Sequence, residues 1–501
     1  MDMASAKGKN NKVRHHAAIT ALLVPLTLLF IVLLYYWNIG TGNWVAGAKF
    51  VIAVLALWII GSVIVKVNAI GKEDAVGGLL IVGGRRGIGF MEYLARGREK
   101  FWDMFAQVGL VMSFGAASYF LFKGQITKKA YVIGFVLIAV MFFVVWPFII
   151  LAFNVITLPG VHISVQTVQL QLPVLNYTLL LEVVSLFAGG FAFFLMALLA
   201  VGAGSIIYSI LTFAGNVVVS HTVNTTILST QIPGAEPIIP GINIPLIAGI
   251  LAFAVVLIVH EFSHGVLFTT YRKKVKRTGL IIFGVIPVGG FADAGEKAMK
   301  QLGKKQQNRV LVAGVMANYL FTFIFFIAAF LMMNYVMPTL YTNSVVISGT
   351  IPGTPAYNTL IPGSTILYWN GHAVTNITAL EAAAKSDTAG SVVNIQTNNG
   401  SYNIVANSTG KVGVYITQQQ VPARSGAYFS IANFLYQFAV LAFVLNLFVA
   451  IFNLLPLPIG LDGWHIFKNA LPEKAMRIFM YLTIIIFIAI LLPWIWYFMG
   501  I

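Results

Sequence analysis

The sequence predicts a polytopic α-helical membrane protein with about nine transmembrane helices and one small inserted α+β domain. Hydrophobic residues fill 59% of its 501 positions and charged residues only 9%, a composition that a soluble fold could not bury. Several uncharged apolar runs reach the roughly 20 residues that a helix needs to cross a bilayer. Between residues 341 and 424 the apolar runs shorten to strand length, and Gly and Asn become frequent.

The charged residues set limits on partners and on metal ligands. The chain has 31 Lys and Arg against 15 Asp and Glu, and the basic residues stand beside the apolar runs. Because no basic segment carries interleaved aromatic residues in a folded module, this excess predicts cytoplasmic anchoring and no nucleic-acid partner. The chain has no cysteine, so a metal site would use His, carboxylate and water.

The first 243 residues predict a membrane extension that follows a basic cytoplasmic tail at residues 1–16. Residues 85–104 alternate basic and apolar residues, which is typical of an interfacial amphipathic helix but also fits a plain cytoplasmic loop. Residues 179–213 form either one long helix or a hairpin broken around residues 202–204. A lysine-rich link at 123–129 leaves a ten-span topology open. The other predicted spans of the extension, residues 17–243, are about 17–36, 50–65, 104–122 and 131–153.

The strongest chemical signal is a His-Glu-x-x-His pattern inside the apolar run 244–272. On a helix, His260 and His264 project from one face and can hold one metal ion. Glu261 stands beside the first imidazole, where a carboxylate can accept a proton from water activated by the metal. Such residues in a membrane-length segment need partners, so the pattern predicts an intramembrane site for zinc hydrolysis. The basic cluster 272–277 predicts that this end of the helix faces the cytoplasm.

The next apolar stretch, residues 280–291, is unfavourable for a helix because it contains Gly284, Pro287, Gly289 and Gly290. It predicts a re-entrant extended segment, which is tolerated at membrane depth only beside protein or a water-filled cavity. A span at about 310–337 follows, and its Gly314 and Asn318 lie on one face, where small residues allow close helix packing.

The inserted domain, residues 341–424, predicts strands separated by one short helix at 379–385. Its Asn-x-Ser/Thr patterns at Asn376, Asn399 and Asn407 are consistent with an extracytoplasmic position. Its predicted strands are 345–348, 365–368, 392–396 and 402–405.

Two imidazoles leave zinc short of a third protein ligand. Asp462 stands out because two prolines and two glycines between residues 453 and 463 break a helix that should be crossing the bilayer. The other interpretation is a loop between spans, with Asp462 in a surface turn. The candidates inside or beside apolar segments are Glu182, Asp293, Asp462 and His465.

Two stretches together resemble the paired signature of the site-2 protease family of intramembrane zinc metalloproteases: His260-Glu261-Phe262-Ser263-His264 and Asn453-x-x-Pro456-x-Pro458-x-x-Leu461-Asp462-Gly463. Residues 313–318 resemble that family's glycine-x-x-x-asparagine helix. The inserted domain resembles a PDZ domain, although Ser364 stands where an acidic residue is usual. A second departure is Trp464, where many bacterial members have glycine. The resemblance covers residues 244–501, with a catalytic core in two halves, 244–338 and 425–501.

The resemblance implies that His260, His264 and Asp462 hold Zn²⁺ and that Glu261 accepts the proton of the attacking water. Asn453 would hydrogen-bond the substrate backbone or the developing oxyanion. The implied substrates are membrane-spanning protein segments in the lipid bilayer, cut near its cytoplasmic side, with the PDZ-like domain extracytoplasmic. The residues implied to contact the substrate are Gly289, Gly290, Asn318 and Pro456.

Two rival functions remain at this stage, and the oligomeric state is open. The first is a transporter or receptor whose His and Asp residues form an ion path without hydrolysis. The second is a zinc peptidase of another type, with a Glu ligand from a later helix. The absence of Glu from the apolar segments after residue 264 argues against the second.

Overall fold

The computed structural model describes scattered positions between 23 and 33 and residues 43–67, 75–76, 78–85, 87–149, 175–219, 238, 240–241, 244–284, 286–422 and 426–495. These residues contain seven helices long and apolar enough to cross a membrane, which supports a multi-pass helical protein. The second predicted span is α2 (Asn43–Val67), whose apolar part is shorter than those seven. The first predicted span, 17–36, lies largely outside the described residues.

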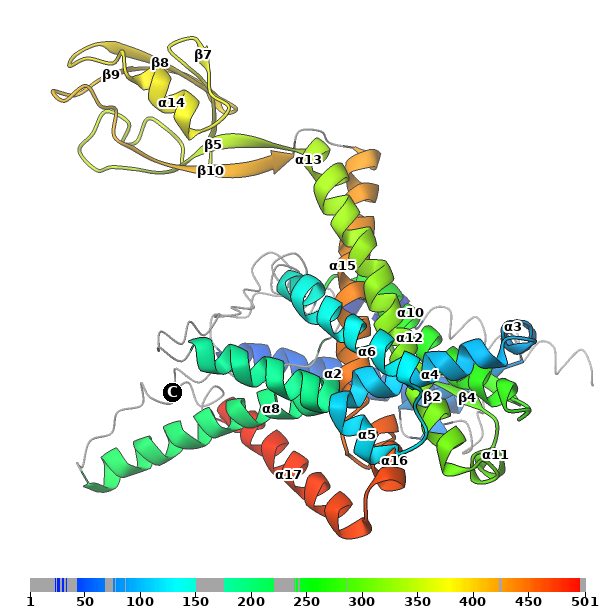
Figure 1. The fold of residues 1–501 in the computed structure, drawn as a ribbon. Coiled ribbons are helices and arrows are strands. Elements are labelled where there is room, and N and C mark those ends of the chain that lie inside the picture. Colours follow the sequence, from blue (N-terminus) through cyan, green and yellow to red (C-terminus); the bar gives the residue numbers. More distant parts are fainter. Residues whose placement is uncertain are drawn as a thin grey trace, which may run out of the picture. The chain divides into compact units, whose positions relative to one another are not determined.

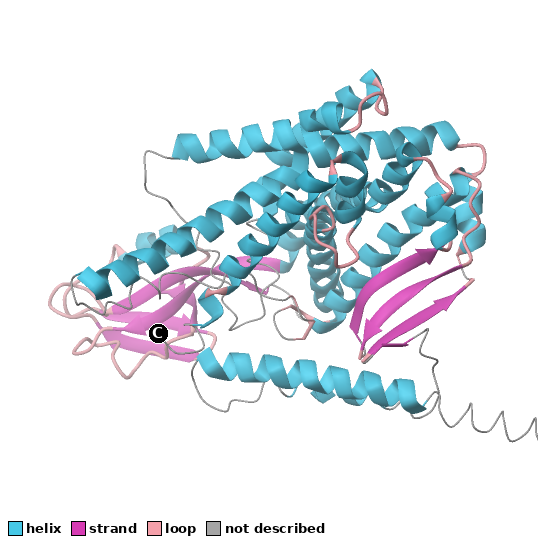
Figure 2. Cartoon of the chain, turned by 90° about the horizontal axis from the view of Figure 1, so that it is seen from below, coloured by secondary structure: helices cyan, strands magenta, loops and turns pink. Residues whose placement is uncertain are grey.

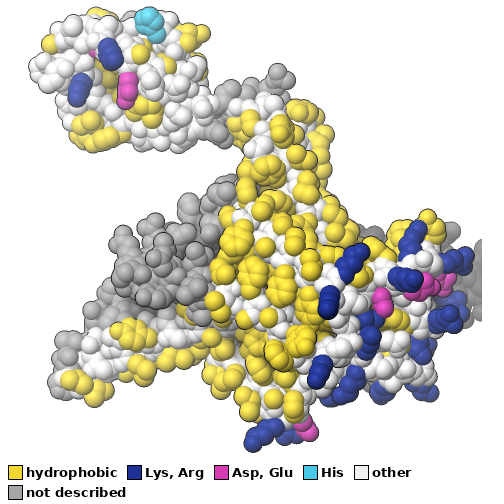
Figure 3. All heavy atoms as spheres, in the orientation of Figure 1, with side chains coloured by type: hydrophobic (Ala, Val, Ile, Leu, Met, Phe, Trp, Pro, Cys, Tyr) yellow, Lys and Arg dark blue, Asp and Glu magenta, His cyan; other side chains and the backbone are white. Residues whose placement is uncertain are grey.

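The described chain divides into two compact units, and each is treated by itself. The first unit comprises residues 1–327 and 437–501, and the second comprises residues 328–436. On the first unit, hydrophobic side chains cover much of the visible helical surface, while Lys and Arg gather around α3, α11 and the nearby strands (Figure 3). Exposed apolar helices with basic residues gathered at one end are typical of membrane helices.

Residues 85–104 contain one short helix and the start of a candidate membrane span, rather than one amphipathic helix. Helix α3 (Ile88–Ala95) ends before Gly97, whose positive φ of 69° is not helical. Helix α4 (Glu99–Phe114) begins two residues later. The extension continues through η1 (Gly115–Ala117), α5 (Ser118–Leu121), α6 (Lys128–Val140) and η2 (Met141–Val145). Helix α6 begins at a side-chain cap, since the Thr127 hydroxyl accepts from the Ala130 N–H.

Helix α8 (Leu175–Val219) is broken, but at Gly190 rather than at residues 202–204. Gly190 has φ 65° and ψ −167°, and a Cβ there would lie 2.4 Å from the backbone of Phe114. Gly115, which has φ 53°, lies on the other side of the same contact. A Cβ added to Gly115 would lie 2.6 Å from the Gly190 nitrogen. The two backbones touch, so neither position can carry a side chain. Gly202 and Gly204 have open space around them and continue the helix.

The predicted extended segment is a β-hairpin that packs on the helix with the His pattern, α10 (Leu246–Thr270). Its strands are β3 (Arg277–Phe283) and β4 (Ile286–Asp293). Two strands that the sequence did not predict, β1 (Ala75–Val76) and β2 (Leu79–Gly84), complete an antiparallel sheet of order β1-β2-β3-β4 (Figure 2). Helix α11 (Glu296–Lys300) and the long α12 (Lys304–Leu331) follow.

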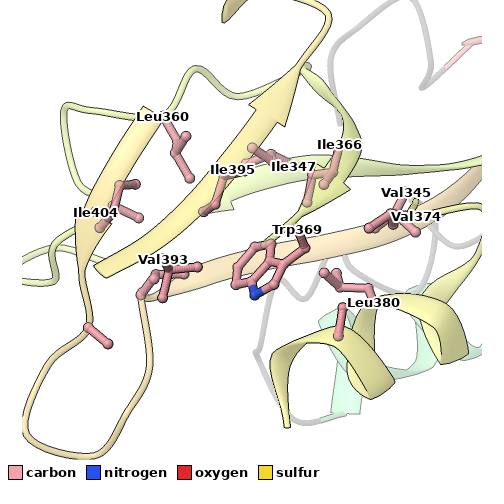
Figure 4. Packing of buried hydrophobic residues seen from close by; sticks show 14 residues of the cluster. Val345, Ile347, Leu360, Ile366, Trp369, Val374, Leu380, Val393, Ile395 and Ile404 are labelled. Carbon is pink, nitrogen blue, oxygen red and sulfur yellow. The ribbon is translucent and has the colours of Figure 1, made fainter. Parts of the chain in front are cut away.

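The second unit contains the predicted α+β domain. Its sheet has the order β10-β5-β6-β8-β9, with β7 paired to β6, and every pairing is antiparallel. Buried apolar side chains around Trp369 form its core (Figure 4), and the Trp369 indole donates to Asp387 at 2.9 Å. The four predicted strands and the helix are present, whereas β7 and β10 were not predicted. Their bounds are β5 (Tyr341–Thr350), β6 (Thr365–Trp369), β7 (His372–Ala373), α14 (Ile377–Ala384), β8 (Val392–Thr397), β9 (Gly400–Val405) and β10 (Val414–Pro422).

Three helices complete the chain. Helix α15 (Ala427–Phe452) ends where the predicted break begins, and α16 (Asp462–Ala470) starts at the candidate aspartate. The last span is α17 (Glu473–Leu491), which packs on α8 (Figure 1). The second unit also contains η3 (Met332–Val336) and α13 (Met337–Leu340), which precede β5.

Candidate metal and catalytic site

The two histidines of α10 are buried and face one another. His260 is 5% exposed and His264 is 8% exposed, and their ring centroids lie 4.8 Å apart at an interplanar angle of 82°. The four-residue spacing therefore places both imidazoles on one helix face, as the sequence predicts. Both Nε2 atoms approach one carboxylate oxygen, Oδ2 of Asp462, at 3.1 Å from His260 and 3.3 Å from His264.

The broken segment after α15 brings Asp462 to the imidazoles. The Gly463 N–H donates to the Asn453 carbonyl at 2.7 Å, which closes the segment into a loop. A Cβ on Gly463 would lie 2.2 Å from the Leu454 carbonyl, so only glycine permits this approach. Asp462 then starts α16 with its side chain 13% exposed, and the interpretation as a surface turn is wrong.

The electrostatics of Asp462 suit a ligand. Its buried carboxylate oxygen Oδ2 has both Nε2 atoms as polar neighbours. A buried carboxylate needs such partners or a metal ion. Two other candidate ligands lie elsewhere, since Asp293 is 3.5 Å from the Arg277 guanidinium and His465 is exposed on α16.

The remaining ring nitrogens have partners that leave both Nε2 atoms facing the shared oxygen. His264 Nδ1 donates to the Val310 carbonyl of α12 at 2.7 Å. His260 Nδ1 lies 3.2 Å from the Asn318 side-chain nitrogen, while Asn318 Oδ1 is buried without a partner. Because amide O and N positions are assigned from contacts, turning the Asn318 amide lets His260 Nδ1–H donate to its Oδ1 and leaves the His260 Nε2 lone pair for a metal. Metal-binding histidines are commonly oriented in this way.

Gly314 leaves the space in front of the imidazoles empty. A Cβ on Gly314 would lie 2.6 Å from His264 Nε2 and 2.7 Å from His260 Nε2. Zinc bonds of about 2.0–2.2 Å in a tetrahedron put neighbouring ligand atoms about 3.4 Å apart. The 3.1 and 3.3 Å separations to Asp462 are close to that value, so the two His and the Asp fit a zinc ion.

Glu261 lies beside the imidazoles and under strand β4. Ligand atoms of Glu261, His260 and His264 all lie within 4.8 Å of one another. A Cβ on Gly290 would lie 2.6 Å from Glu261 Cγ, so β4 crosses the carboxylate at a glycine. The Ala292 N–H of the same strand donates to this carboxylate. The strand therefore fixes the candidate general base next to the candidate metal ligands.

The residues predicted to contact the substrate differ in burial and in their present partners. Asn453 is half-buried, and its side-chain nitrogen donates to the Val449 carbonyl at 3.0 Å. Gly289 is half-buried on β4, and Pro456 is buried in the broken segment. Asn318 is fully buried against His260. Their roles toward a substrate stay predictions.

Sequence reasoning missed two contributors to the site. The sequence predicts close helix packing for Gly314 but not its position opposite the two Nε2 atoms, and it gives no role to Val310, which acts through its backbone carbonyl. An Asn four residues after a Gly in an apolar helix was the available signal for this face of α12.

The fold and the site define a multi-pass membrane protein with a buried His-His-Asp ligand set and an adjacent glutamate. The sequence model of peptidase family M50 matches residues 248–492, so this part of the chain belongs to that family, and the resemblance to the site-2 proteases is confirmed. The uncharacterized protein MJ0971 of Methanocaldococcus jannaschii is 29% identical over 255 residues. That similarity covers 49% of this chain and 64% of the relative, which is less than two thirds of the relative's length.

Proposed function

We propose that this protein is an intramembrane zinc metalloprotease that hydrolyses peptide bonds in membrane-spanning segments of other proteins. The observation that carries the proposal is the meeting of one Asp462 oxygen with the Nε2 atoms of His260 and His264, on elements more than 190 residues apart in the chain. The family match over both halves of this site supports it.

The chain's own residues have distinct tasks in this proposal. His260, His264 and Asp462 would hold zinc, which supplies Lewis-acid activation of a water molecule and of the scissile carbonyl. Glu261 accepts the proton of the attacking water and returns it to the leaving amine. The contact with Gly290 and the hydrogen bond from β4 hold the Glu261 carboxylate in place beside the imidazoles. Asn453 donates to the developing oxyanion or to the substrate backbone.

Strand β4 offers a way to hold the substrate. Among the described strands, β4 pairs with β3 alone, so its other side has backbone groups for an added strand. A substrate must unwind first, because the carbonyls of a helix are occupied and screened by side chains. A substrate paired beside Gly289 and Gly290 would cross the site next to Glu261, with Asn318 and Pro456 as further predicted contacts.

The cellular setting follows from the charges and the inserted domain. The basic residues around the end of α10 support a cytoplasmic position for the site, near one face of the bilayer. The PDZ-like domain would lie on the opposite side, where it filters substrates by size or binds an extracytoplasmic tail. In this setting the reaction is regulated intramembrane proteolysis.

The test uses purified full-length protein in detergent and a model single-span substrate. Wild type, Glu261→Gln and Asp462→Asn are compared for cleavage, with bound zinc quantified in each. We expect wild type to cut, Glu261→Gln to bind zinc without cutting, and Asp462→Asn to lose zinc. Equal zinc in all three with no cleavage would refute the assigned roles and favour the rival ion-binding site.

A further inference from the structure

We propose that Asp103, in the membrane extension that precedes the family match, is a positioning residue for the metal ligands. It belongs to a hydrogen-bonded group, here called the polar brace, that joins the extension to α10, α12 and α16. This inference rests on the proposed zinc site but not on the proposed hydrolysis. The members of the polar brace are Asp103, Gln125, Tyr271, Gln307, Asn308, Arg309 and Asn469.

The Asp103 carboxylate of α4 holds two helix ends together. Its Oδ1 accepts from the Tyr271 hydroxyl at 2.5 Å, and its Oδ2 accepts from Arg309 Nη1 at 2.6 Å. The Arg309 guanidinium, which is 5% exposed as a residue, also donates through Nη2 to the Gln125 carbonyl at 3.0 Å. A buried guanidinium needs a charged partner, and Asp103 supplies it. One Asp103 oxygen therefore binds the residue that follows α10, and the other binds a residue of α12.

These two helix ends are directly connected to the candidate ligands. Tyr271 immediately follows α10, which carries His260 and His264. Arg309 immediately precedes Val310, whose carbonyl accepts from His264 Nδ1 at 2.7 Å. By fixing α10 against α12 at this end, Asp103 sets the register in which that carbonyl meets the imidazole. The same register places Gly314, one helical turn further along α12, opposite the two Nε2 atoms.

A third arm of the polar brace reaches the element that supplies Asp462. The Asn469 side chain, on α16, donates to Gln307 Oε1 at 3.1 Å and to Asn308 Oδ1 at 3.0 Å. Asn308 is 1% exposed, and its nitrogen lies 3.5 Å from Gln125 Oε1 in the link between α5 and α6. Helix α16 begins at Asp462, so all three ligand-bearing or ligand-facing helices meet the extension in one network.

A role limited to stability would leave the metal site unchanged in any folded variant, whereas a positioning role would not. The test therefore measures zinc affinity by chelator competition and the visible absorption of the cobalt-loaded protein, both without substrate. Full-length wild type, Asp103→Ala, Asp103→Asn and Tyr271→Phe are compared in detergent. The matched control is Glu473→Gln, which breaks an exposed carboxylate–arginine pair with Arg477 on α17.

We expect Asp103→Ala to lower zinc affinity about tenfold and to change the cobalt absorption, as loss of outer contacts does at other metal sites. Asp103→Asn keeps one carbonyl acceptor and should recover part of the affinity, and Glu473→Gln should match wild type. A monodisperse Asp103→Ala protein with wild-type zinc affinity and cobalt absorption would overturn the proposal.

Two further outcomes are separated by this design. If Asp103→Ala does not fold, Asp103→Asn and Tyr271→Phe decide, and wild-type affinity in both overturns the proposal. Zinc binding that depends on Asp103 in a protein that cuts no substrate would refute the proposed function and leave the polar brace standing.

Discussion

Replacing Gly314 by alanine tests the geometry of the site most directly. The new methyl carbon would lie 2.6 Å from His264 Nε2, about 1 Å inside the usual contact distance of about 3.5 Å. Its neighbours are donor atoms on buried rings held by Val310 and Asn318, so they have little room to move. Overpacking of this kind costs about 1–3 kcal/mol.

Helix propensity alone would predict that Gly314→Ala stabilises the protein, which is the opposite of the effect expected here. A Gly-to-Ala change inside a helix normally stabilises it by about 1 kcal/mol. If the steric cost falls on the ligand set, 1–3 kcal/mol corresponds to a loss of about 5–150-fold in zinc affinity. Gly204→Ala is the matched control, because Gly204 lies in helix α8 with nothing within 4 Å of its Cβ position, and it should keep wild-type zinc affinity.

The assay is zinc affinity by chelator competition on full-length protein in detergent, with thermal unfolding of each metal-free variant recorded alongside. We expect Gly314→Ala to bind zinc more weakly than both wild type and Gly204→Ala. Wild-type affinity in Gly314→Ala would show that the space in front of the two Nε2 atoms is not where the metal lies.

Three other changes probe the same site. Gly290→Ala puts a methyl 2.6 Å from Glu261 Cγ and should reduce cleavage about 100-fold at unchanged zinc content; zinc loss would contradict this. Asn318→Leu removes the partner of His260 Nδ1 and should lower zinc affinity about 10–100-fold, with partial recovery in Asn318→Asp. Chelation should lower the thermal unfolding temperature, since zinc at 100 times its Kd adds about 2.7 kcal/mol of stability, and an unchanged temperature would argue against a bound metal.

Local patterns were sufficient for the parts of the site that depend on spacing. His260 and His264 share a helix face because four residues make about one turn, and the sequence shows that directly. The glycines and prolines between residues 453 and 463 predicted a broken helix, because these residues interrupt helical hydrogen bonding within an apolar run. An extended segment after α10 was predicted on the same grounds, and it contributes to the hairpin of β3 and β4.

Features that depend on contacts between distant segments were not visible in the sequence. The break in α8 falls at Gly190 because that backbone touches Gly115, whereas the more conspicuous glycines at 202 and 204 have open surroundings. Strand β2 acquires its structure by pairing with β3, far along the chain, and the two-residue β1 pairs with β2 in turn. The partners of the two His Nδ1 atoms, Val310 and Asn318, come from α12, and no spacing rule assigns them.

The mixed origin of the four-stranded sheet has a consequence for where this protein can be cut. Two of its strands come from residues before 85 and two from residues 277–293, with Ile81 opposite Ile281. A chain shortened to the family match would lack β2 and leave the backbone amides and carbonyls on that side of β3 unpaired, next to β4. Such bare strands invite intermolecular pairing and aggregation. The region that matches the family therefore does not form its complete sheet alone. Any truncated or chimeric version of it needs to include strands β1 and β2.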